Sequence, residues 1–162
     1  MRRKDKEMTD ILDKMDVISK CKVCCLGLSD RDNPYVVPLN YGYSFENDAL
    51  MLFFHSATEG RKMEIIKRNN RACFEIHCDT RLIAAESPCK FGYEFRSVIG
   101  FGTITVLDRP DEKAEALNLI MKHQTGQDTV FDFTAKQLEN VCTYKLAVEM
   151  FTGKRKLNLI GK

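Results

Sequence analysis

The chain has 162 residues, of which 44% are hydrophobic and 30% are charged, and its formal net charge at pH 7 is +2. This composition is that of a globular domain with its own core, and it excludes disordered and fibrous proteins. Basic and acidic residues are interleaved, and the longest apolar run, Ala49 to Phe54, is far shorter than the roughly 18 residues of a membrane-spanning helix. We therefore expect neither a nucleic acid nor a membrane as partner.

The N-terminal segment and the cysteines indicate the compartment. The segment MRRKDKEM mixes basic and acidic residues and precedes an amphipathic pattern, which is not typical of a secretory signal. The seven cysteines are odd in number and lie mostly inside apolar stretches, which favours buried, reduced thiols over a disulfide framework. These features predict a cytoplasmic protein.

The first half of the chain predicts one amphipathic helix followed by strands. Apolar residues recur at helical spacing in residues 8–20, which favours a helix lying across the core. These residues are Met8, Ile11, Leu12, Met15 and Ile18. Segments rich in β-branched and aromatic residues then predict strands at 22–29, 35–45, 49–56 and 71–79, with a helix at 57–70. The second and third strands are expected to form a hairpin.

The second half of the chain predicts two further strands, at 93–108 and 142–151, on either side of a helix at 111–123. The residues expected to bury one face of this helix are Ala116, Leu117, Ile120 and Met121. Six strands with several hairpin-length connections favour a mainly β (α+β) fold. Because closure would remove the sheet edges, we predict a single domain over residues 1–162, a six-stranded antiparallel barrel with flanking helices.

The junction HSATEGRK raises an electrostatic question. Ser56 and Glu59 fit the capping-box pattern, which predicts a helix start near Ala57 and places Arg61 and Lys62 close to its positive N-terminal end. A bound phosphate would offset that repulsion, because free N–H groups at a helix start bind anions. The alternative is a solvated helix face balanced by neighbouring acids. The glycine at position 60 favours a ligand, because it weakens a helix but lets a ligand approach the backbone.

A proline inside the predicted strand 35–45 points to the same region. Pro38 removes one donor from the hydrogen-bond ladder, so it is expected at an edge, a bulge or a special site. A strand that borders a ligand groove meets this condition. An edge strand that faces only water meets it equally well.

Four segments, PYVVPLNYGY, LFFHSATEGRK, IIKRNNRACFEI and FRSVIGFGTI, resemble in this order the motifs of the FMN-binding split-barrel proteins related to pyridoxamine phosphate oxidase. The chain is most similar to the nitroimidazole-resistance branch of that family. The resemblance covers Lys22 to Asp108 and implies a split barrel that forms a homodimer. It also implies FMN, or FAD in its place, bound in the groove between the subunits.

The resemblance further implies where the cofactor is held. The isoalloxazine would lie along residues 36–40, the phosphate would bind the basic pair that follows the next strand, and the second subunit would contribute from RSVIG. The implied cofactor residues are Val37, Pro38, Leu39, Asn40, His55, Ser56, Gly60, Arg61 and Lys62, with Arg96 and Ser97 from that second segment. Arg61 suits bidentate phosphate contact and Lys62 a point charge.

The implied function is a flavin-dependent oxidoreductase that passes electrons from reduced FMN to a small acceptor, such as the nitro group of an imidazole drug. His55 is the candidate catalytic proton donor. Two alternatives stay open: a flavin-binding module without turnover, and a haem-binding protein with His55 as ligand. True pyridoxamine phosphate oxidase activity is not expected. The family resemblance implies a longer chain with a C-terminal substrate-binding motif for those enzymes, whereas this sequence ends in FTGKRKLNLIGK.

Three other patterns are given structural interpretations. His123 is expected to interact with the C-terminal carbonyl groups of its own helix. Cys73, Glu75 and His77 share one face of a strand but supply no complete tetrahedral set, so no metal site is predicted. The basic tail GKRKLNLIGK is expected to be solvated, although it could also contact RNA or the partner's cofactor.

Overall fold

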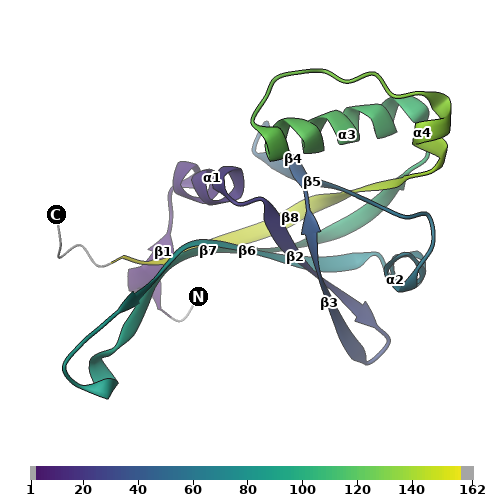
Figure 1. Ribbon diagram of the computed structural model, residues 1–162. Coiled ribbons are helices and arrows are strands. Elements are labelled where there is room, and N and C mark those ends of the chain that lie inside the picture. The colour runs from purple at the N-terminus through teal and green to yellow at the C-terminus, as the bar shows by residue number, and fades with distance from the viewer. Residues whose placement is uncertain (1–2, 158–162) are drawn as a thin grey trace.

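The computed structural model describes residues 3–157, in which one antiparallel sheet is covered by helices (Figure 1). The helical elements are the 3-10 turns η1 (Lys4–Lys6) and η2 (Pro88–Lys90) and the α-helices α1 (Ile11–Lys20), α2 (Arg61–Arg68), α3 (Pro110–Thr125) and α4 (Ala135–Glu139). The strands are β1 (Glu7–Met8), β2 (Val23–Asp30), β3 (Asn33–Asn40), β4 (Gly42–Glu46), β5 (Ala49–Ser56), β6 (Arg71–Ile83), β7 (Gly92–Leu107) and β8 (Cys142–Lys156). The tail that was expected to be solvated begins inside β8, because Gly153 to Lys156 pair with β7, so that expectation was wrong for these residues; the last five residues lie outside the described part.

The sheet has the strand order β3-β2-β6-β7-β8-β5-β4, and β1 pairs with β8. All of these pairs are antiparallel, as expected for a mainly β fold with hairpin connections. The hydrogen-bonded path does not close, because β3 and β4 stand at its two ends among the described residues. The antiparallel split-barrel fold is therefore confirmed, whereas full closure of the barrel was wrong.

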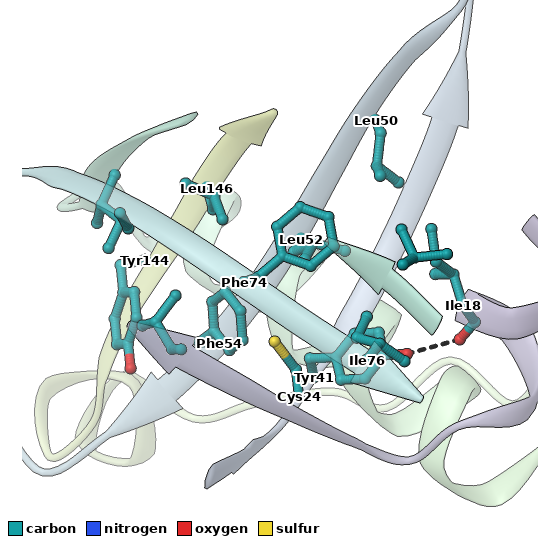
Figure 2. Packing of buried hydrophobic residues seen from close by; sticks show 14 of the residues in the cluster. Ile18, Cys24, Tyr41, Leu50, Leu52, Phe54, Phe74, Ile76, Tyr144 and Leu146 are labelled. Atoms are coloured by element: carbon teal, nitrogen blue, oxygen red, sulfur yellow. Dashed lines mark hydrogen bonds between the residues drawn. The ribbon is translucent and has the colours of Figure 1, made fainter. Parts of the chain in front are cut away.

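The prediction of six strands was too low, because the predicted strand 35–45 is two strands that meet at Tyr41. The first of them, β3, pairs with β2, and the second, β4, pairs with β5, so the predicted hairpin forms only through β4. Tyr41 is fully buried, and its hydroxyl donates a hydrogen bond of 2.6 Å to the carbonyl of Ile18 in α1 (Figure 2). Burial of this side chain fixes the point where the chain leaves one end of the sheet for the other.

The core lies inside the curved sheet and is built from the inward residues of its strands. Phe54 of β5 and Tyr144 of β8 are adjacent in the strand register, and their rings stack with centroids 5.5 Å apart (Figure 2). Phe74 from β6 and Leu146 from β8 are also fully buried. Each large side chain buried in this way contributes about 1.5–3 kcal/mol to folding.

The first helix begins three residues later than predicted, at Ile11, because Asp10 caps it by accepting a hydrogen bond from the Leu12 N–H group. Met8 belongs to β1, where it pairs with Gly153 and is buried. Leu12 is 72% exposed, contrary to the expected inward stripe. The buried face of α1 consists of Val17 and Ile18.

The helix predicted at 111–123 forms as α3, which packs on β4 and β5 (Figure 1). Ala116 and Ile120 are buried as expected, whereas Leu117 and Met121 are only partly buried. A Cβ atom on Gly42 of β4 would lie 2.5 Å from the backbone of α3, so glycine is required for this close approach. Within residues 3–157, no helix combines the length and the apolar character that crossing a membrane requires.

Candidate functional site

The junction between β5 and α2 differs from its prediction. Helix α2 starts at Arg61, and the capping box predicted from Ser56 and Glu59 does not form. Ser56 stays in β5, paired with Cys142, and its hydroxyl donates to the carbonyl of Ala57 at 2.9 Å. A side chain held in a strand four residues before the N-cap cannot reach the first N–H groups of the helix.

The residue that precedes α2 is Gly60, in a backbone conformation with φ of +130° that favours glycine. Its carbonyl accepts from the N–H groups of Met63 and Glu64. The N–H groups of Arg61 and Lys62 therefore have no partner within the helix. No atom lies within 4 Å of the position that a Cβ atom on Gly60 would take, so the backbone is accessible here.

The two cations of the junction have different surroundings, and the first, Arg61, is already paired. Its guanidinium lies 3.3 Å from the carboxylate of Asp30 and 5.0 Å from the ring centre of Tyr35. Asp30 also binds Arg68, at 2.7 Å. Arg61 is thus held on the side of α2 that faces the end of β2.

The second cation, Lys62, has no ion-pair partner among residues 3–157. Its ammonium group lies 5.7 Å from the ring centre of Tyr144, and burial lowers the pKa of Lys62. A half-buried ammonium group without a carboxylate nearby is unfavourable unless a ligand or solvent compensates it. Lys62 is therefore the better placed of the two cations to receive an anion.

Two consecutive residues at the start of β8, whose side chains point to opposite faces of the strand, carry buried hydroxyl groups without hydrogen-bond partners among residues 3–157. The two residues are Thr143 and Tyr144, and both side chains are fully buried. Burial raises the pKa of Tyr144, while nearby Ser56 lowers it to a smaller extent without meeting the geometry of a hydrogen bond. A buried hydroxyl left unpaired costs about 1–3 kcal/mol. Tyr144 thus presents a protonated donor close to Lys62 and Ser56.

The candidate catalytic residue His55 lies on the outer face of the sheet. Its backbone pairs with Thr143, and its exposed side chain has no hydrogen bond to the part of the chain that is described. Lys62 and Tyr144 lie on the inner side of the same strand pair. His55 therefore lies at the same end of β5 as Ser56 and α2, but on the opposite face of the strand pair from Lys62 and Tyr144.

The residues expected along the isoalloxazine lie in β3, which is an edge strand as Pro38 predicted. Val37 and Leu39 pack toward the core, whereas Pro38 and Asn40 face outward. The Asn40 side-chain amide donates to the Gln124 side chain at 3.1 Å and to the Lys22 carbonyl at 3.3 Å. The side chain of Asn40 is thus engaged in structure, and its backbone remains at the open edge.

Arg96 and Ser97 lie near the other end of β8. Arg96 pairs in register with Arg155, which is separated from Tyr144 by roughly 35 Å of extended strand. The guanidinium of Arg96 contacts Asp16 at 2.6 Å and Asp79 at 2.5 Å, and the Arg96 side chain is only 12% exposed. Ser97 lines a surface cavity of about 260 Å³ with Lys154. One chain therefore does not bring these two residues to the α2 junction.

Apolar side chains form a strip on the outer face of the sheet. Val36, Phe101 and Met150 are 65%, 47% and 60% exposed, and they are connected across the sheet by paired Gly27 and Cys73. An exposed apolar patch that spans several strands is typical of a surface that contacts another protein. We refer to these five residues as the outer strip.

His123 does not bind the end of its own helix, contrary to prediction. It is buried, its Nδ1 atom lies 2.7 Å from the Tyr41 carbonyl oxygen, and its Nε2 atom lies 3.1 Å from the Ser19 carbonyl oxygen. The imidazole therefore joins α3 to α1 and to the β3–β4 junction. Burial lowers the pKa of His123.

Sequence reasoning missed Tyr144 and Asp30. The alternation of CTYKLAVEMF places Tyr144 on the buried face of a strand, but a strand pattern gives no information on the partners of a hydroxyl. The Asp30 carboxylate, paired with Arg61, comes from a distant strand end. Only the tertiary fold decides which of two adjacent cations it binds.

Known proteins resemble this chain in sequence and structure. Residues 12–155 match the sequence model of the family described as pyridoxamine 5'-phosphate oxidase. No curated protein matches the sequence. A solved structure of a candidate 5-nitroimidazole antibiotic resistance protein from Bacteroides thetaiotaomicron VPI-5482 is 31% identical, with a TM-score of 0.78 over 92% of this chain and 86% of that one.

Two more distant solved structures share the fold. The FAD and haem binding protein from Mycobacterium smegmatis is 17% identical, with a TM-score of 0.83 over 97% of this chain and 76% of that one. The flavocytochrome Anf3 from Azotobacter vinelandii is 19% identical, with a TM-score of 0.80 over 98% of this chain and 72% of that one. At these identities the likeness establishes the fold alone.

Proposed function

The chain belongs to the pyridoxamine 5'-phosphate oxidase family, and from this premise we propose that it is an FMN-dependent oxidoreductase that passes electrons to a small acceptor. The observation that carries the proposal is the half-buried Lys62, which has no ion pair in residues 3–157 and lies at the N-terminus of α2. A phosphate would compensate both the ammonium group and the free N–H groups of the helix. Arg61, fixed by Asp30, adds positive charge beside it.

The edge strand β3 supports a place for the flavin ring. Its outer backbone groups from Val37 to Asn40 have no neighbouring strand, and Pro38 leaves one position without a donor. Planar ring atoms with hydrogen-bonding groups at their rim match such an edge. Ser56 and Gly60 would border the chain that joins the ring to the phosphate.

The flavin, when bound, supplies one- and two-electron transfer, and the protein supplies binding, orientation and protons. Reduction of a nitro group to the nitroso level takes up two electrons and two protons and releases one water. His55, exposed at the end of β5, is the group that we assign to proton delivery. The name of the 31% identical relative from B. thetaiotaomicron supports a nitroimidazole as the acceptor.

The cofactor assignment is tested by releasing and identifying the chromophore of the purified protein. We expect FMN, with an absorbance that is bleached by dithionite and restored by a nitroimidazole under anaerobic conditions. If dithionite reduces the bound flavin but the nitroimidazole does not reoxidise it, the protein binds flavin without having this activity. A Soret band without flavin would replace the proposal with haem binding.

We further propose a homodimer that covers the outer strip and brings Arg96 and Ser97 of the second subunit to the cofactor. Phe101→Lys places a charge in this apolar surface, and we expect the protein to shift from dimer to monomer in light scattering and to lose flavin. Val130→Lys is the matched control, because Val130 is 77% exposed and lies outside the strip. A monomeric wild type, or a Phe101→Lys dimer that keeps its flavin, would contradict the proposal.

The free thiols and the reduced cofactor suit the cytoplasm, which we propose as the compartment.

A further inference from the structure

The unpartnered hydroxyl of Tyr144 has a position that packing alone does not explain. The ring fills the core against Phe54, and a phenylalanine would fill the same space. The hydroxyl group is fully buried, yet it donates to no atom of residues 3–157. In folded proteins such groups are nearly always paired, so an exception calls for a specific cause.

The surroundings of this hydroxyl match those of an anion site. Lys62 lies over the ring at 5.7 Å from its centre, and Lys62 also contributes one of the two free N–H groups at the start of α2. Ser56 lies two residues beyond Phe54, the cross-strand partner of Tyr144, and its hydroxyl already donates its own proton to the Ala57 carbonyl. Among residues 3–157, no carboxylate forms an ion pair with Lys62 that would compete with an incoming anion.

We propose that the Tyr144 hydroxyl is a specificity-determining donor for a terminal phosphate monoester, which it meets when the flexible Lys62 side chain moves from the ring to the phosphate. This inference rests on the proposed function and deepens it. Burial keeps the phenol protonated, so it donates to a phosphate oxygen and does not repel it.

The depth of the hydroxyl selects the kind of phosphate. Tyr144 has no exposed surface, so only a compact terminal group that takes the place of the moved Lys62 side chain would meet its hydroxyl. The phosphate of FMN is such an end and carries a charge close to −2. In FAD the phosphates continue into a nucleotide, and riboflavin has no phosphate. Tyr144 is therefore expected to favour FMN over both.

The test is the variant Tyr144→Phe, compared with the wild type in titrations of the apoprotein with FMN, FAD and riboflavin. We expect FMN affinity to fall about tenfold to a hundredfold, as for loss of a hydrogen bond to a charged group, while riboflavin affinity stays the same. The melting temperature of the apoprotein should stay the same or rise, because the variant removes an unpaired buried hydroxyl.

Tyr41→Phe is the matched control, because it removes a buried hydroxyl that has a partner, the Ile18 carbonyl. This control should lower the melting temperature and leave FMN affinity unchanged. A Tyr144→Phe variant that melts earlier, as the control does, or that binds FMN as tightly as the wild type, would overturn the inference.

A separate arm distinguishes failure of the inference from failure of the proposed function. If the wild type binds no flavin, the proposed function fails, and the role of Tyr144 is decided with inorganic phosphate. Phosphate should then raise the melting temperature of the wild type more than that of Tyr144→Phe. Equal stabilisation, or none, would mean that the hydroxyl recognises no phosphate.

Discussion

Polar groups in or beside the two ends of strand β8 differ in whether they have partners. At its C-terminal end, Arg96 of β7 and Arg155 lie side by side, Arg96 paired with two carboxylates and Arg155 with one. At its N-terminal end, Tyr144 has no hydrogen-bond partner and Lys62 no ion pair in the described chain. Polar groups paired within the chain stabilise its fold, whereas buried groups left without partners are the stronger candidates for ligand binding.

The largest effect is expected at the paired end. Arg96→Met would leave Asp16 and Asp79 without their shared cation, and we expect a loss of about 2–3 kcal/mol in the free energy of unfolding. Both carboxylates are partly exposed, which keeps the loss below that of a fully buried pair. Urea denaturation measures it.

The matched control for Arg96 is Arg155→Met. The pair between Arg155 and Asp13, 2.8 Å apart, is exposed, so its removal should cost less than about 1 kcal/mol. Equal losses in the two variants would mean that burial does not distinguish Arg96. The comparison between the two ends of β8 would then lose its basis.

Much of the fold was predictable, because strand and helix patterns depend on local sequence. The strand 49–56 has the predicted bounds, and Pro38 indicated an edge strand. The break at Tyr41 was not predictable, since the apolar pattern of 35–45 runs through it. Its cause is a contact with Ile18 of α1, which a strand pattern does not contain.

The candidate site was predictable only in part, because its residues depend on partners from distant segments. The S-x-x-E pattern at Ser56 predicted a cap that does not form, since pairing of Ser56 with Cys142 keeps it in β5. The same kind of pattern does form a capping box at Thr134 and Gln137, where no strand competes. The roles of the cofactor residues, including His55, remain predictions.

The next effect compares the two adjacent cations at the unpaired end. Lys62→Met should weaken FMN binding by about 1.5–3 kcal/mol, because it removes a cation that has no partner in residues 3–157. Arg61→Met should weaken it less, because Asp30 already neutralises much of that charge. Isothermal titration at low and high salt measures both.

These two variants should also differ in stability. Burial disfavours the charged form of Lys62, so Lys62→Met should not destabilise the apoprotein. Arg61→Met removes a partner of Asp30 and should destabilise it slightly, by less than about 1 kcal/mol because the pair is exposed. A greater loss of FMN affinity in Arg61→Met would reverse the assignment of the direct phosphate contact.

The smallest effect is expected at His123. Its state is intermediate between the fully paired and the unpaired polar groups, because both of its ring nitrogens face carbonyl oxygens. A neutral imidazole has one N–H group, so it can donate to one of them only. Burial outweighs the two carbonyl groups, which raise the pKa of His123, so the pKa of His123 is lowered in the folded protein. The unfolded chain then takes up the proton first as the pH falls below about 6.5.

Stability should therefore decrease from about pH 6.5 downward, with a slope of at most about 1.4 kcal/mol per pH unit from this one proton. The decrease should end once the pH is below the pKa of the folded state. His123→Gln should flatten this part of the curve in urea denaturation between pH 5 and 7. If stability instead increased as the pH fell, the imidazolium would donate to both carbonyls, and hydrogen bonding would outweigh burial at this position.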